Sequence, residues 1–131
     1  MSVLFEGAHC TLTLDWPAPG VTLVVFTGKD TNEFGDAPFQ ELDAHLAPGT
    51  ELYIDARKAT AASIDVSAEW AKWLGRRKGS FARVSMLTGS KFIQMSADFV
   101  RRFADLGELM RLYTDAVAFE HALQISIASR G

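Results

Sequence analysis

The chain has 131 residues, of which 48% are hydrophobic and 22% charged, and its formal net charge is −3. These totals are typical of one globular domain that buries its own core, so we expect a single domain over residues 1–131. A net negative charge argues against a nucleic-acid binder and against a protein that binds anionic membranes, because both usually carry a basic surface.

Cysteine content and hydropathy indicate the compartment. The single cysteine, Cys10, excludes an intrachain disulfide. The first residues lack the basic and long apolar regions of a signal peptide, and no apolar run approaches the roughly 20 residues that span a bilayer. We therefore expect a soluble, cytoplasmic protein.

The first regular elements are two strands. Residues 11–14 (Thr-Leu-Thr-Leu) alternate polar and apolar side chains, which is typical of a half-buried strand. A turn rich in proline and glycine follows at residues 15–20. Residues 21–27 are β-branched and almost wholly apolar, which indicates a strand covered on both faces. The short turn between the two predicts a hairpin.

A helix and a strand come next. Phe39, Leu42 and Leu46 form one apolar stripe of a helix that begins near Asp36, whose side chain we expect to cap it. Residues 51–55 then predict a short strand.

The rest of the chain alternates helices and strands. A second helix is predicted from about Asp65 to Lys78, with Trp70 and Trp73 on its apolar face as core residues. Residues 83–88 and 109–113 predict strands, and Thr114 and Asp115 open a last helix. A third helix lies between these strands, and we expect its apolar stripe to pack in the core: Phe92, Met95, Phe99, Phe103 and Leu106.

The resulting order is β-β-α-β-α-β-α-β-α. Such alternation implies right-handed crossovers and a largely parallel sheet, with the first hairpin as an antiparallel edge. Residues 57–64 are expected to form a loop from a strand end to a helix start, where open α/β sheets place functional groups.

Several local sequences resemble the STAS domains of anti-sigma-factor antagonists (SpoIIAA-like proteins). Residues 26–30 (Phe-Thr-Gly-Lys-Asp) are similar to the entry to the family's first helix, and residues 64–67 (Ile-Asp-Val-Ser) to the Asp-Ser-Ser/Thr-Gly motif that opens its second. Residues 112–123 resemble the last strand and terminal helix. The resemblance implies a mixed sheet of four to six strands with helices packed on it.

The resemblance also implies a function. In the antagonists, a serine at the start of the second helix is phosphorylated by a partner kinase, and phosphorylation releases that kinase. Ser67 takes the place of this serine and Asp65 that of the motif's aspartate, while Val66 and Ala68 replace a serine and the glycine. Ser63 is the other phosphorylation candidate.

Asp30 is expected at the same end of the sheet as this helix start. Asp30, Asp65 and Ser67 would then contact an anti-sigma-factor-like serine kinase or another regulatory protein. Considered without the resemblance, Ser67 is an ordinary first-turn residue and Asp65 a helix cap.

Two other functions remain open. The nine Phe and three Trp residues would suit a domain that binds a small apolar ligand in a pocket. A small enzyme would need Asp55, Asp65 and a histidine brought together by folding. The sequence shows no known catalytic motif, and no cofactor is predicted. A metal site is not predicted either, since His9, His45 and His121 have no ligand partners at metal-binding spacing. We therefore expect a non-catalytic protein.

Overall fold

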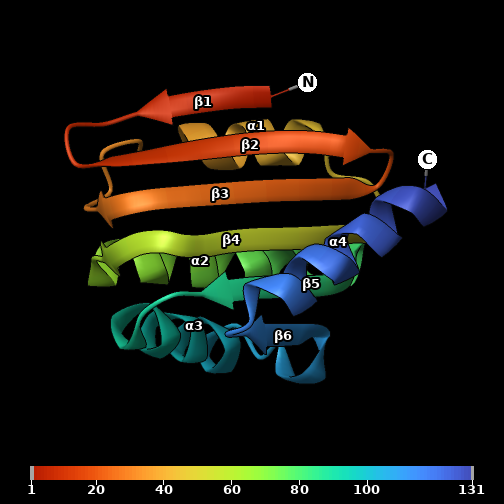
Figure 1. Ribbon diagram of the computed structural model, residues 1–131. Helices are drawn as coiled ribbons and strands as arrows, with labels where there is room; N and C mark the ends of the chain where they lie inside the picture. The colour runs from red at the N-terminus through yellow and green to blue at the C-terminus, as the bar shows by residue number, and fades with distance from the viewer. Residues whose placement is uncertain (1, 131) are drawn as a thin grey trace.

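The computed structural model describes residues 2–130, which form a six-stranded sheet with four helices (Figure 1). The strands lie in the sheet in sequence order, β1-β2-β3-β4-β5-β6. The first three strands pair antiparallel, and β3 through β6 pair parallel. The strands are β1 (Ser2–Glu6), β2 (Cys10–Ala18), β3 (Val21–Asp30), β4 (Thr50–Ala62), β5 (Phe81–Thr88) and β6 (Met110–Tyr113). The helices are α1 (Ala37–Ala44), α2 (Ile64–Arg77), α3 (Lys91–Phe103) and α4 (Ala116–Arg130), with short 3-10 turns at η1 (Lys78–Ser80) and η2 (Gly107–Leu109).

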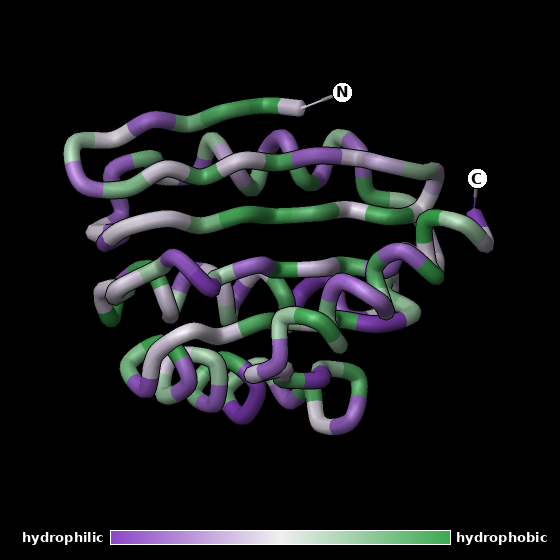
Figure 2. The backbone as a smooth tube through the Cα atoms, viewed as in Figure 1, coloured by the Kyte–Doolittle hydropathy of each residue, from purple (hydrophilic) through white to green (hydrophobic). Residues whose placement is uncertain are grey.

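The predicted hairpin is confirmed and extended by one strand. β2 and β3 pair antiparallel, with Leu12 opposite Phe26 and Leu14 opposite Val24 on the face that the first helices cover. The N-terminal residues add β1 as an antiparallel edge strand, which the predicted order did not contain. Figure 2 shows the hydrophobic stretch of β3 in the middle of the sheet, as expected for a strand covered on both faces, with Val24 in the core under α1 to α3 and Val21 in the core under α4.

The helices lie on both faces of the sheet. Residues of α1, α2 and α3 share one core with β2 to β6, and α4 packs on the opposite face against Tyr53, Leu87 and Tyr113. Trp70 and Trp73 are buried in the larger core, which confirms their predicted role. The Trp73 indole Nε1 donates a 2.9 Å hydrogen bond to Asp43 Oδ1, so the polar atom of this ring is satisfied.

Three strands are longer than expected. β2 continues to Ala18, through residues predicted as a turn, and β3 continues past residue 27 to Asp30. Residues 57–62 form the end of strand β4 rather than a loop, because β4 stays paired with β3 as far as Asp30 and Ala62 through two register shifts. Asp36 is at the N-cap position of α1, but its side chain makes no capping hydrogen bond.

The predicted burial of the third helix is wrong. Phe92, Met95, Phe99 and Phe103 are exposed, and α3 buries Ile93, Ala97 and Val100 against the sheet instead. Both sets of residues recur at helical spacing, so the helix carries two adjacent apolar faces. The smaller side chains occupy the face toward the sheet because they let the helix approach it closely. Leu106 is buried, as expected, but lies beyond the helix end.

Candidate functional site: a pocket between the sheet and helices α2 and α3

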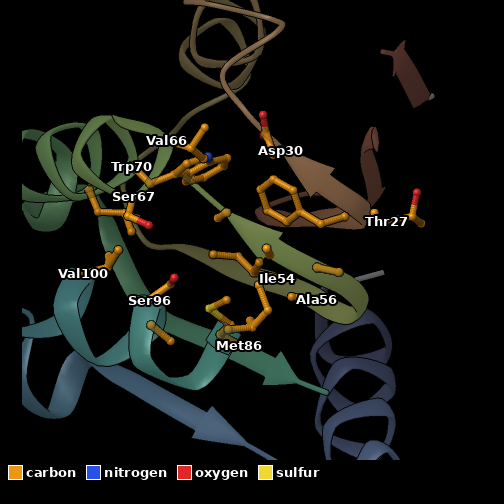
Figure 3. A pocket seen from close by; sticks show the side chains of 18 of the residues that line it. Thr27, Asp30, Ile54, Ala56, Val66, Ser67, Trp70, Met86, Ser96 and Val100 are labelled. Atoms are coloured by element: carbon orange, nitrogen blue, oxygen red, sulfur yellow. The ribbon is translucent and has the colours of Figure 1, made fainter. Parts of the chain in front are cut away.

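A pocket lies between the carboxyl-terminal parts of β3 and β4 and the helices α2 and α3 (Figure 3). The cavity volume is about 60 Å³, and the cavity opens to solvent on one side. Nearly all of its surface is apolar. The lining residues are Phe26, Thr27, Gly28, Asp30, Ile54, Ala56, Ala59, Ala61, Ala62, Val66, Ser67, Trp70, Leu74, Met86, Ile93, Ser96, Ala97, Val100 and Met110.

Small residues create this space. Ala56 and Ala59 of β4 are buried under α3, where they pack with Ile93. Ala97 is buried on the facing side of α3. Alanines at these positions leave unfilled the volume that larger side chains would occupy in a close-packed core. Trp70 forms one wall, with its ring edge-on to Phe26 at a centroid distance of 5.4 Å.

Two hydroxyls and one carboxyl group supply the main polar atoms. Ser67 comes from the first turn of α2 and Ser96 from α3, and Figure 3 shows both hydroxyls pointing into the space between the two helices. Asp30 lies at the edge of the pocket, at the end of β3. A mostly apolar pocket with a few polar groups is typical of small-molecule sites.

Asp30 is the buried carboxyl group of the site, with only 7% of its surface exposed. Burial raises the pKa of Asp30 above its ordinary value of 3.8, and the nearby Glu33 adds to the rise. The Asn32 backbone N–H donates a 2.9 Å hydrogen bond to Asp30 Oδ1, which opposes the rise in pKa without cancelling it. The ionised Asp30 carboxylate therefore lowers the stability of the folded protein.

The Asp30→Asn substitution tests this cost. The raised folded pKa means that the folded state binds the proton more tightly than the unfolded chain. The favourable contribution of protonated Asp30 is thus complete below pH 3.8 and is lost as pH rises through the folded pKa. We expect the free energy of unfolding of Asp30→Asn to rise relative to that of the wild type as the pH increases from 3.8 toward neutrality. Urea unfolding at a series of pH values measures this difference.

The Asp65→Asn variant removes an exposed carboxylate from the first turn of α2. It is the control for the loss of one negative charge. A stability difference between Asp30→Asn and wild type that does not change between pH 3.8 and 7 would contradict the buried-charge account.

The start of α2 is capped by Ser63. Its hydroxyl accepts a 3.2 Å hydrogen bond from the Val66 N–H, and its own N–H donates to the Asp30 carbonyl at 2.9 Å. Ser63, rather than the expected Asp65, is therefore the helix cap, and these bonds tie α2 to the end of β3. Asp65 is exposed in the first turn.

The predicted site residues are thus divided between two environments. Asp30 and Ser67 are both buried and line the pocket, whereas Asp65 lies outside it at the surface. Only 8% of the Ser67 surface is exposed. Phosphorylation of Ser67 or Ser63 stays a prediction from the resemblance.

The residues considered for an enzyme do not meet. Asp55 lies on the α4 face of the sheet, where Arg57 bonds to it and to Glu120, while Asp65 lies on α2 on the other face. His9 and His121 are exposed, and the ring of His45 stacks on Trp16. Within residues 2–130, no three His, Cys, Asp or Glu side chains are grouped to hold a metal ion. No helix in that range is long and apolar enough to cross a membrane.

The sequence held one overlooked signal for the pocket. Four of the seven residues from Ala56 to Ala62 are alanine, an unusual composition for a strand, whose preferred residues are β-branched or aromatic. Ser96 and Ala97 gave no such signal, because small residues are ordinary within a helix.

Comparison with known proteins identifies the fold. No family model matches the chain, and no curated protein matches its sequence. An uncharacterized protein of the DUF3478 family with a SpoIIAA-like fold, from Shewanella loihica PV-4, superposes with a TM-score of 0.60 at 14% identity, covering 92% of this chain and 99% of that one. An anti-sigma factor antagonist from Mycobacterium paratuberculosis superposes with a TM-score of 0.52 at 14% identity, covering 95% and 93% of the two chains. The fold is therefore SpoIIAA-like, as the sequence resemblance implied.

Proposed function

We propose that this domain is a non-catalytic binding module whose site is the pocket between the sheet and helices α2 and α3. The observation that carries the proposal is an almost wholly apolar hollow into which two hydroxyls, of Ser67 and Ser96, project. Such a site would take a small neutral amphiphile, with its chain against the alanines of β4 and its hydroxyl head bonded to the serines.

The size of the pocket limits the ligand. An apolar cavity of about 150 Å³ holds benzene, so this cavity of about 60 Å³ would take only a few carbon atoms. The remainder of the molecule would lie in the open mouth. The ligand class we propose is therefore a narrow aliphatic chain rather than a ring system.

Charge sets the second limit. Burial already disfavours the ionised form of Asp30 at the edge of the pocket. A ligand carboxylate placed nearby would add a like charge in a poorly solvated site. A neutral hydroxyl head group avoids this repulsion. We expect the site to prefer alcohols to fatty acids of equal chain length.

A titration with straight-chain alcohols from methanol to octanol tests the proposal, with tryptophan fluorescence as the readout because Trp70 lines the pocket. Each methylene that enters should strengthen binding about fourfold, since its burial is worth about 0.8 kcal/mol. The gain should stop when the pocket is full. The matching carboxylates should bind more weakly, and Asp30→Asn should narrow that difference.

The Ser96→Leu variant fills the pocket from α3 and should lower alcohol affinity at least tenfold. Gln94→Leu, on the same helix but outside the pocket lining, is the matched control and should leave affinity unchanged. Equal loss in both variants, or affinity that does not depend on chain length, would refute the pocket as the binding site.

Regulatory protein binding is the second candidate function. The exposed Asp65 at the start of α2, and the likeness of the fold to that of an anti-sigma factor antagonist, favour a partner that contacts this end of the sheet. In that case Ser67 would be the phosphorylation site that releases a serine kinase, and Asp30 would contribute to the contact. A pull-down from native lysate followed by phosphosite mapping of the bait tests this candidate.

A further inference from the structure

Helix α3 presents an aromatic ridge to the surface. The exposed fractions of Phe92, Met95, Phe99 and Phe103 are 73%, 68%, 36% and 64%. Their spacing of three, four and four residues places all four on one helix face, which we call the α3 ridge. The rings of Phe99 and Phe103 stack at a centroid distance of 5.2 Å. This ridge is distinct from the face of α3 that packs on the sheet.

Charge is unevenly distributed along the chain. Residues 64–104, which contain α2, β5 and α3, hold eight Lys and Arg but only three Asp and Glu, a net charge of +5. The rest of the chain has five Lys and Arg against 13 Asp and Glu, a net charge of −8. Several cations of the basic segment pair with carboxylates, as Arg77 does with Asp43 and Lys78 with Asp105, so the cations next to the ridge decide its character.

Two cations border the ridge directly. Lys91 lies one helical turn before Met95, and Arg102 lies one turn after Phe99, so both are on the same side of the ridge. Both side chains are exposed. Asp98 is the one acidic residue of α3, and its carboxylate is paired with Arg101 at 3.0 Å. An occupant of the ridge must therefore be apolar at its centre and anionic at its edge.

This charge pattern disfavours a second copy of the chain. A two-fold antiparallel packing of α3 on α3, centred on the ridge, would place Lys91 of one copy beside Arg102 of the other. Like charges opposed in this way oppose association.

The ridge is a continuous apolar strip with cations along one side. Four side chains of this type, exposed to this degree, present about 400 Å² of apolar surface. A helix with aromatic residues on one face and Lys or Arg at its border is typical of peripheral contact with an anionic bilayer.

We propose that the α3 ridge, with Lys91 and Arg102, docks the protein on the surface of an anionic lipid bilayer. Ser96 separates the ridge from the packed face of α3 and lines the pocket, so docking would bring the pocket wall close to the lipid. The proposal does not depend on the pocket having a ligand.

Flotation with lipid vesicles tests this docking. We expect the protein to float with vesicles of phosphatidylcholine containing 30% phosphatidylglycerol, not with pure phosphatidylcholine, and more weakly as salt is raised. The variants Phe92→Gln/Phe103→Gln and Lys91→Glu/Arg102→Glu should each reduce vesicle binding at least tenfold. Their exposed positions should leave thermal unfolding unchanged.

Exposed apolar residues on α4 supply the matched control. Val117→Gln/Ile125→Gln removes two such residues from the opposite face and should bind vesicles as the wild type does. Ser96→Leu should also keep vesicle binding while losing alcohol binding, so this docking and the proposed pocket function can fail separately. The proposal would be overturned if the wild-type protein did not float with anionic vesicles at low salt. So would a concentration-dependent dimer, or capture of an acidic protein, that the Phe92→Gln/Phe103→Gln variant abolishes without any effect on vesicle binding.

Discussion

Ser67→Asp is expected to lower the free energy of unfolding by about 3 kcal/mol, because it places a carboxylate in an apolar pocket that already has a buried carboxyl group, Asp30, at its edge. The N-terminus of α2 attracts negative charge, but that effect is worth at most about 2 kcal/mol at a buried position and does not offset the loss of hydration. Ser67→Ala should change stability little. Urea unfolding at neutral pH measures both.

The matched control is Ala68→Asp, which puts the same carboxylate one residue further along α2, at a half-buried position outside the pocket lining. It gains less from the helix N-terminus, yet we expect it to be more stable than Ser67→Asp by about 2 kcal/mol or more because its carboxylate stays hydrated.

The comparison also separates the two candidate functions. If Ser67→Asp is as stable as Ala68→Asp, the side chain at position 67 reaches solvent at little cost. Ser67 could then carry a phosphate on the folded domain, which would favour the partner-switching candidate over the pocket.

Gly28→Ala is expected to be the other strongly destabilising change, with a loss of about 3 kcal/mol or more in the free energy of unfolding. Gly28 has a backbone φ of +77°, a conformation that side chains disfavour. An added Cβ would lie 2.2 Å from the His9 carbonyl oxygen, which is itself held by a 2.9 Å hydrogen bond from the Lys29 N–H. Neither backbone segment can move without breaking the pairing of β2 with β3.

Gly79→Ala is the control for this substitution. No heavy atom lies within 4 Å of a Cβ built there, so we expect its effect on stability to stay within about 0.5 kcal/mol. Thermal or urea unfolding compares the two variants. Similar stabilities would show that β2 and β3 can shift at Gly28. The close approach of the His9 carbonyl would then not contribute to the stability of the fold.

Gly28 also illustrates what the sequence could predict. The sequence predicted a strand over residues 21–27, and in the structure β3 continues through Gly28 to Asp30. The periodicity of residues 11–14 and 21–27 likewise predicted the hairpin correctly. Local patterns of this kind are reliable because they depend on backbone preference and burial within one element.

Features that depend on how elements meet were not predictable in the same way. Residues 57–62 have no strand-like periodicity, and they form strand only because β3 continues alongside them. Helix α3 carries two apolar faces, and the sheet, not the helix, decides which one is buried. The pocket forms where the alanines of β4 meet helices α2 and α3, and the alanine-rich segment indicates only one of these three elements.

The structure brings two of the predicted site residues together, in an environment that the sequence did not indicate, and their function stays a prediction. Asp30 and Ser67 come together at the end of the sheet where the helix start was expected. Burial then changes what they can do: an exposed serine and aspartate would suit a protein contact, whereas a buried pair suits a small ligand.

The most direct measurement of the central claim is a methyl NMR titration with 1-hexanol, which reports where the ligand lies. The pocket account predicts that the methyl signals of Ile54, Val66 and Ile93 shift and saturate together, while those of Val117 and Ile125 on the opposite face do not change. Shifts absent from the pocket methyls, or confined to residues of the α3 ridge, would contradict it.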